Sequence, residues 1–197
     1  MSQMYPLFRG LAPVMVAIGA MVFAQEWLSI GTMLGIGLIS LGLVSITLLG
    51  GKLGQISPKA LRWGLVTSVL IATYTVTDGM GVRAAGNSMS YILWLFSMEC
   101  LPICIMLLLT KRKDWLAYVA NKPGKILLGG IASSAAYGLV IFAMGLGSMA
   151  MVSSLRETSV IFAALIGTLI FKESFGQQRI IAASLVCSGI ILIRWLG

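Results

Sequence analysis

The chain has 197 residues, of which 58% are hydrophobic and only 10% are charged, and its mean hydropathy is +0.98. About a quarter of the residues of a soluble globular domain are charged, so this composition excludes a water-soluble domain and indicates a helical membrane protein. The net charge of +8 does not indicate a nucleic-acid partner. The basic residues lie in short gaps between apolar runs, as they do in proteins embedded in a lipid bilayer.

Seven apolar runs follow one another, most near the ~20 residues that a helix needs to cross a bilayer. The expected spans are residues 10–24, 30–49, 60–77, 89–110, 124–143, 147–171 and 178–195. None of the polar gaps is long enough for a separate soluble domain, including the longest one, TKRKDWLAYVANKPGK at 110–125. We therefore predict an all-α fold: a polytopic membrane bundle of seven transmembrane helices.

The two ends of the chain repeat one pattern with a displacement of 147 residues. Six identities fall between residues 5 and 47 and their equivalents: Arg9 and Arg156, Ala17 and Ala164, Glu26 and Glu173, Leu38 and Leu185, Gly42 and Gly189, and Ile46 and Ile193. Five crossings separate the first span from its equivalent, and an odd number predicts that the two copies run in opposite directions. Inverted repeats of this kind are typical of secondary transporters, in which two halves rock about a central site.

The repeat also predicts how the chain is divided. If the spans at 147–171 and 178–195 close a repeat, that repeat has five helices and occupies residues 51–197. Residues 1–50 then hold the last two helices of a first repeat, which is incomplete. We expect three more helices to belong before residue 1.

Two stretches, PVMVAIGAMVFAQEWLSIGTMLGIGLISLGLV and SVIFAALIGTLIFKESFGQQRIIAASLVCSGIILI, resemble the closing helix pair of the EamA-type repeat in the drug/metabolite transporter superfamily. In both, a helix ends in an apolar–Glu turn and the next helix has a late Gly. The segment YTVTDGMGVRAAG resembles the first helix of a second repeat. The resemblance implies a ten-helix exporter or permease for small metabolites, amino acids or drugs, without an ATP site. We expect no cofactor.

Glu99 is the acid that we expect to matter most for transport. It lies near the middle of the span at 89–110, where a charge costs at least ~2.5–3.5 kcal/mol and usually faces a cavity or a partner. Pro102 follows it and frees a helical carbonyl. We predict either a proton or cation relay at Glu99 or, alternatively, a protonated side chain bonded to a neighbouring helix.

Five other residues are candidates for the substrate or proton pathway. Tyr74 and Asp78 lie one helical turn apart at the end of a span, and they indicate either a gate or a local pair of Asp78 with Arg83. Trp94 and Tyr137 indicate either aromatic walls of a cavity or core packing. Arg156 is expected either to line the cavity or to extend towards the membrane interface.

Three groups of residues have a structural interpretation from the sequence. Glu26 and Glu173 are expected to bind the free N–H groups of the helix that follows each of them. Small residues at 31 and 35, and at 130, 134 and 138, predict close helix contacts, although the second group could leave room for a substrate. The three cysteines are expected to be small buried packing residues, with Cys100 and Cys104 on one helical face. With no histidine in the chain, we expect no metal site.

Orientation and activity each leave an alternative open. Eleven of the fourteen Lys and Arg residues lie on the side of the N-terminus, which places that side in the cytoplasm, whereas the family resemblance implies a cytoplasmic C-terminus. The expected location is a cell membrane, the bacterial inner membrane. We predict a secondary transporter, with Glu99 as the residue that would couple it to protons. The alternative is a non-transporting truncated product or a membrane subunit whose missing helices come from a homodimer or helper. An enzyme is disfavoured because no hydrolase constellation can be assembled.

Overall fold

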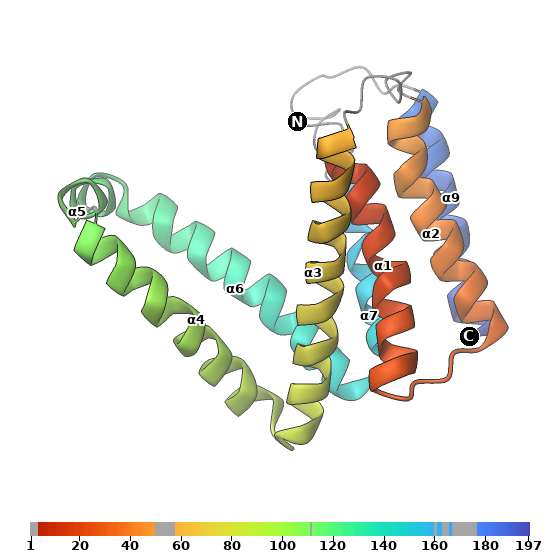
Figure 1. Cartoon of the computed structure of the whole chain (residues 1–197), viewed down its shortest axis with the longest axis horizontal. Coiled ribbons are helices and arrows are strands. Elements are labelled where there is room, and N and C mark those ends of the chain that lie inside the picture. The colour runs from red at the N-terminus through yellow and green to blue at the C-terminus, as the bar shows by residue number, and fades with distance from the viewer. Residues whose placement is uncertain (1–3, 50–57, 111, 160, 163–165, 167–176) are drawn as a thin grey trace. The chain divides into compact units, whose positions relative to one another are not determined.

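The structure is a computed structural model that describes every residue except 1–3, 50–57, 111, 160, 163–165 and 167–176 (Figure 1). The helices with defined bounds are α1 (Met4–Phe23), α2 (Ile30–Leu49), α3 (Pro58–Ala84), α4 (Ser88–Thr110), α5 (Arg112–Asn121), α6 (Pro123–Leu146), α7 (Met149–Arg156) and α9 (Gln177–Leu196). They form two compact units. The first unit is Met1–Asp78 with Gly147–Gly197, and the second is Gly79–Leu146.

The described helices have the lengths and composition of a membrane protein. Three of them contain a segment that is long and apolar enough to cross a bilayer: Leu61–Ala84, Ser88–Thr110 and Pro123–Leu146. Phe8–Phe23, Ile30–Ile46 and Ile180–Leu196 are shorter apolar helices. The prediction of an all-α membrane fold is confirmed, while the number of seven spans stays a prediction.

The core of the first unit contains the packing of α2 against α9, which lie side by side in Figure 1. Their bounds differ by 147 at both ends, so each helix occupies the same part of the repeat. Glycines hold the two backbones together: a Cβ on Gly35 would lie 2.7 Å from the carbonyl oxygen of Gly189, and one on Gly42 would lie 3.0 Å from that of Ala182. The close helix contact predicted at positions 31 and 35 is therefore present.

The repeated helices run in opposite directions. A Cβ on Gly31, near the start of α2, would meet Leu196 at the end of α9, whereas Gly42 meets Ala182 near the start of α9. Helices α1 and α7 are also antiparallel, because Ala20 near the end of α1 packs against Met149 at the start of α7. This is the relation that the odd number of crossings predicted for the two copies.

The second unit is a hairpin of α4 and α6 with the C-terminal end of α3, and α5 links the two arms. Gly86, with φ of +67°, ends α3, and the Asn87 side chain accepts from the N–H groups of Met89 and Ser90 to cap α4. At the other end, Arg83 donates to the carbonyl of Met144 at 3.0 Å. Beyond a small core of Val82, Ile92, Ile141 and Met144, most of the hairpin is exposed.

Three expected boundaries were wrong. Helix α3 continues to Ala84 rather than ending near residue 77. The polar gap at 110–125 contains α5. The span expected at 147–171 is interrupted, because α7 ends at Arg156, followed by a turn at 157–158. The N–H groups of Glu157 and Thr158 donate to carbonyls three residues back, which closes the helix at this point. Residues 160, 163–165 and 167–171 of that span lie outside the described residues.

Candidate functional site

A pocket of about 290 Å³ lies within the first unit, between α1, α3 and α7. We call it the charged pocket; its lining residues are Phe8, Arg9, Ala12, Thr67, Ile71, Tyr74, Arg156 and Glu157. Two residues predicted from sequence, Tyr74 and Arg156, lie here. The side chains come from three helices that are far apart in the sequence, so the fold creates the pocket.

The interruption of α7 places two charges at the pocket. Arg156 is the last residue of the helix and Glu157 is its C-cap, with φ −69° and ψ −13°. Discontinuous helices at membrane depth are tolerated where they line a cavity, and they commonly form the substrate sites of secondary transporters. The break therefore marks this pocket as the candidate site.

Glu157 is the centre of an ion-pair network. Its side chain is only 1% exposed, and its Oε2 accepts from Nε of Arg9 at 2.5 Å. A second guanidinium nitrogen of Arg9 donates to the Ser159 hydroxyl at 3.1 Å. Arg156 approaches from the other side, with its Nε 3.5 Å from Oε1 of Glu157. Two arginines that are equivalents in the repeat thus converge on one buried carboxylate.

The network is incomplete on the side of Arg156. Nε of Arg156 and Oε1 of Glu157 are both buried and make no hydrogen bond in the described structure. An unsatisfied buried polar atom of a charged group is costly, typically by more than the ~1–3 kcal/mol of a neutral one. A bound molecule with a hydrogen-bonding group would remove that cost, which is a further sign of a ligand site.

Glu26 has a different partner from the one expected. We predicted that it would bind the N-terminus of the following helix, but Ser29 has that place and accepts from the N–H of Thr32 at 3.0 Å. Glu26 instead accepts from the Ser148 hydroxyl at 3.0 Å and from the N–H of Met149 at 3.1 Å, at the start of α7. Its carboxylate therefore joins the two copies of the repeat. Glu173 lies outside the described residues.

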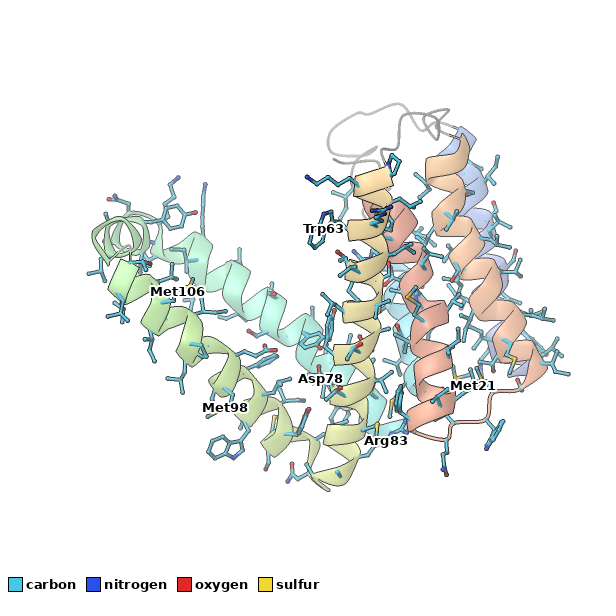
Figure 2. The ribbon with its side chains drawn as sticks, in the orientation of Figure 1. Met21, Trp63, Asp78, Arg83, Met98 and Met106 are labelled. Atoms are coloured by element: carbon cyan, nitrogen blue, oxygen red, sulfur yellow. The ribbon has the colours of Figure 1, made fainter. Side chains whose placement is uncertain are left out.

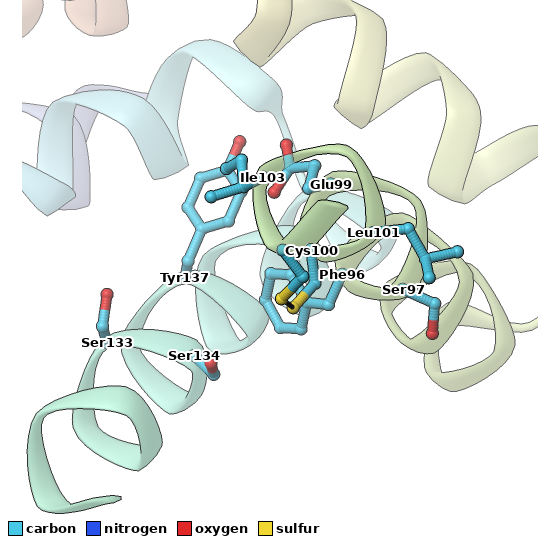
Figure 3. A pocket seen from close by; sticks show the side chains of 10 residues that line it. Phe96, Ser97, Glu99, Cys100, Leu101, Ile103, Ser133, Ser134 and Tyr137 are labelled. Atoms are coloured by element: carbon cyan, nitrogen blue, oxygen red, sulfur yellow. Dashed lines mark hydrogen bonds between the residues drawn. The ribbon is translucent and has the colours of Figure 1, made fainter. Parts of the chain in front are cut away.

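A second pocket, of about 790 Å³, lies within the second unit between α4 and α6 (Figure 3). We call it the thiol pocket; its lining residues are Phe96, Ser97, Glu99, Cys100, Leu101, Ile103, Cys104, Ser133, Ser134 and Tyr137. Figure 3 shows the Glu99 carboxylate and the Tyr137 hydroxyl at the same end of this pocket. Two of the predicted residues, Glu99 and Tyr137, therefore line the thiol pocket, whereas Tyr74 and Arg156 line the charged pocket.

The expectation that the three cysteines are buried was wrong. Cys100 and Cys187 are exposed and Cys104 is half-buried. The prediction that Cys100 and Cys104 share a helical face is confirmed, since their sulfurs lie 3.5 Å apart. Cys100 and Cys104 are accessible because α4 and α6 pack loosely, with only 6% of each apolar span buried. For the same reason the small residues of α6 contact α4 only in part: a Cβ on Gly130 would meet nothing within 4 Å, whereas one on Gly138 would lie 3.5 Å from Ile92.

Two predicted residues lie outside both pockets. Asp78 is buried in α3 and Trp94 is 67% exposed on α4. Neither is among the residues lining the charged pocket or the thiol pocket. Figure 2 shows Asp78 and Arg83 towards the C-terminal end of α3 and Trp63 near its N-terminal end.

Most of the chain matches a known protein family. The model of the EamA-like transporter family matches residues 58–195, from the start of α3 into α9. The chain belongs to this family. It is therefore a membrane transporter or permease by family, and the predicted resemblance to this family is confirmed; the match includes the second Glu–Gly helix pair, while the first lies before its start. No curated protein matches the chain.

Arg9 and Glu157 are the site residues that the sequence analysis missed. A signal for Arg9 was present, because Arg9 and Arg156 are one of the six identities of the repeat. That identity aligns the two copies, but it does not by itself indicate that both arginines face one cavity. Glu157 had no such signal, since its repeat equivalent is Gly10.

Proposed function

We propose that this chain is a secondary transporter that moves a small molecule across the membrane by alternating access, with the charged pocket on the route. One observation carries the proposal: Arg9 and Arg156, equivalents in an inverted repeat, converge on buried Glu157 at the break after α7. A site shared by both copies at their junction is accessible from either side when one copy rocks against the other.

Proton coupling at Glu99 is the finer part of this proposal. Glu99 lines the thiol pocket next to Tyr137, a position that suits a residue exchanging protons with water. Replacement with Gln removes the titrating group and preserves the shape of the side chain. We expect Glu99→Gln to abolish transport driven by a proton gradient while leaving exchange of substrate across the membrane intact. Loss of both activities would show that Glu99 has another role.

Alternating access can be tested without knowing the substrate. Thr67 lines the charged pocket and is exposed, so a Thr67→Cys variant in a background with Cys100, Cys104 and Cys187 changed to Ser reports on the pocket. We expect a membrane-impermeant maleimide to label this cysteine in liposomes from either side. The controls are Gln25→Cys, in the exposed turn after α1, and Asn121→Cys, at the exposed end of α5. Because three predicted spans separate these two positions, each should be labelled from one side, opposite to the other.

The result decides between the two functions predicted from the sequence. Labelling of Thr67→Cys from both sides supports a carrier whose pocket opens alternately. Labelling from one side alone would contradict the proposal and favour a membrane subunit that does not transport by itself.

A further inference from the structure

We propose that the charged pocket binds small organic monoanions, with the carboxylate of the ligand held by the guanidinium groups of Arg156 and Arg9. This inference rests on the proposed function, because it names the class of substrate for the same pocket. It is carried by the charge balance, the unsatisfied atoms and the size of the site.

The charge balance of the lining is positive. Two guanidinium groups face one carboxylate, and among the described residues no other acid lines the pocket. Glu26 is engaged at the opposite end of α7, and Glu99 belongs to the second unit. The repeat does not supply a second acid either, because a Cβ on Gly10 would lie 3.0–3.1 Å from Leu43, Val44 and the Ser40 carbonyl. There is no room for a larger side chain at that position.

An excess positive charge favours an anionic ligand here more than it would on a water-facing surface. Glu157 is 1% exposed and Arg156 is 19% exposed, so water screens the site weakly. A monoanion neutralises the excess charge of one unit, whereas a cation would double it. A zwitterion would leave it unchanged. Charge complementarity of this kind discriminates strongly between ligands of opposite sign.

The unsatisfied atoms match the hydrogen bonds of a carboxylic acid derivative. Nε of Arg156 is a buried donor that makes no hydrogen bond, and a guanidinium fork fits the two oxygens of a carboxylate. Oε1 of Glu157 is a buried acceptor that lies 3.5 Å from Nε of Arg156 but makes no hydrogen bond, so an N–H or O–H group elsewhere on the ligand could bind it once the ligand carboxylate engages Arg156.

The rest of the pocket is suited to a small apolar body. Phe8, Ala12 and Ile71 form part of its wall. Its volume of about 290 Å³ equals roughly ten water-sized volumes of ~30 Å³. An aromatic or branched monocarboxylate of about ten non-hydrogen atoms fills such a space.

Three molecules of one shape test the charge class directly. Benzoate, benzamide and benzamidinium differ in charge but hardly in size. We would measure the binding of each to the purified full chain in detergent by calorimetry and thermal shift. Benzoate should bind at least tenfold more tightly than benzamide, as expected for hydrogen bonds to a charged group, and benzamidinium should bind most weakly. Equal binding of the three, no binding by any, or a preference for benzamidinium would overturn the inference.

Arginine variants locate the binding to this pocket. Arg156→Gln should reduce benzoate affinity by tenfold or more, and Arg156→Lys should restore part of it, because Lys keeps the charge but loses the fork. Arg194→Gln, on the exposed last turn of α9, is the matched control and should leave the affinity unchanged. If Arg156→Gln does not fold, the comparison of the three ligands on the natural chain still decides the charge class. Unchanged affinity in folded Arg156→Gln would show that benzoate binds elsewhere.

The two proposals fail in different ways. If benzoate is not preferred but Thr67→Cys is labelled from both sides, the substrate class is wrong and alternating access stands. If Thr67→Cys is labelled from one side while benzoate binding depends on Arg156, the pocket binds anions and the transport cycle is wrong.

Discussion

The two units use apolar residues in different ways. In the first unit, side chains such as Ile39 and Leu43 are fully buried between helices of the same unit. In the second, α4 and α6 have mean hydropathies of 2.3 and 1.9 over their spans, yet only 6% of each span is buried. Helix α2 of the first unit is at least as apolar as α4 and α6, yet its residues Ile36, Ile39 and Leu43 are buried. Hydropathy in this chain therefore does not distinguish a packed helix from an exposed one, because lipid tails are as apolar as the side chains of a protein core.

Small residues show the same contrast. Gly31 and Gly35 on α2 lie against the backbone of α9, while on α6 a Cβ added to Gly130 would meet nothing within 4 Å and one on Gly138 would only reach ordinary contact with Ile92 and Phe96. The small residues at 31 and 35 and those at 130, 134 and 138 satisfy the same sequence rule for helix contacts. The rule identifies a helix face that permits close approach. Whether the approach occurs depends on a partner helix that also has small residues at the contact.

The largest expected effect comes from the buried charge of the first unit. Glu157→Gln removes the buried anion and leaves the half-buried guanidinium groups of Arg9 and Arg156 without it, so we expect the free energy of unfolding to fall by about 3 kcal/mol, the lower end of the range for breaking a buried ion pair. The matched change in the second unit, Glu99→Gln, affects an exposed side chain and should cost less than about 0.5 kcal/mol. Unfolding in mixed micelles with increasing denaturing detergent measures both. Similar losses would remove the contrast between the units.

The glycine contact gives the next largest effect. In Gly35→Ala the new methyl group would collide with Ile193 and the carbonyl oxygen of Gly189. We expect a loss of about 1–3 kcal/mol in the free energy of unfolding, as for other overpacked contacts. Gly37→Ala, on the same helix with nothing within 4 Å, is the control and should be neutral or slightly stabilising. If both variants behave alike in the same unfolding assay, α2 and α9 do not pack through this face.

The link between the two copies at Glu26 is worth less. Glu26→Ala removes the acceptor for the Ser148 hydroxyl and for the first N–H of α7. A lost helix cap typically costs about 1 kcal/mol, and Glu26→Gln should recover part of that because an amide oxygen still accepts. The same unfolding measurement applies. A neutral Glu26→Ala would mean that the start of α7 does not depend on the other copy.

The smallest change is expected at the turn after α1. Gln25 has φ of 53°, in the left-handed region that a residue with a side chain adopts at a cost. Gln25→Gly should therefore raise the free energy of unfolding by about 0.5–1 kcal/mol. An equal change in Gln25→Ala, which keeps a Cβ, would exclude backbone conformation as the cause.

Local sequence patterns were sufficient to predict several helix bounds and the relative direction of the two copies. The bounds of α2 match the prediction at both ends, and α4 begins within one residue of it. The direction of the copies followed from counting spans. The break after Arg156 was missed because apolar residues continue on both sides of it, so an average over about twenty residues passes across the interruption. Helix α5 was missed because its charged residues are typical of a loop.

The candidate site was predicted less well, because its contacts join distant parts of the chain. Arg9 and Glu157 are 148 positions apart, and Glu26 reaches a helix that begins 123 positions later. The residues around a carboxylate in the sequence do not indicate which helix end it will bind. Tyr74 and Arg156 were among the predicted residues and line one pocket, but nothing in the sequence separated them from Glu99 and Tyr137, which line another.

The contacts between α2 and α9 have a reciprocal form. Gly35 meets Gly189, and Gly42 meets Ala182; Gly189 is the equivalent of Gly42, and Ala182 is the equivalent of Gly35. At these two pairs of positions the interface is therefore symmetric: each contact is repeated when the two helices exchange places. A copy of residues 30–49 turned upside down would meet the original through the same two pairs of positions. Equivalent surfaces of α2 and α9 therefore form the two sides of this contact.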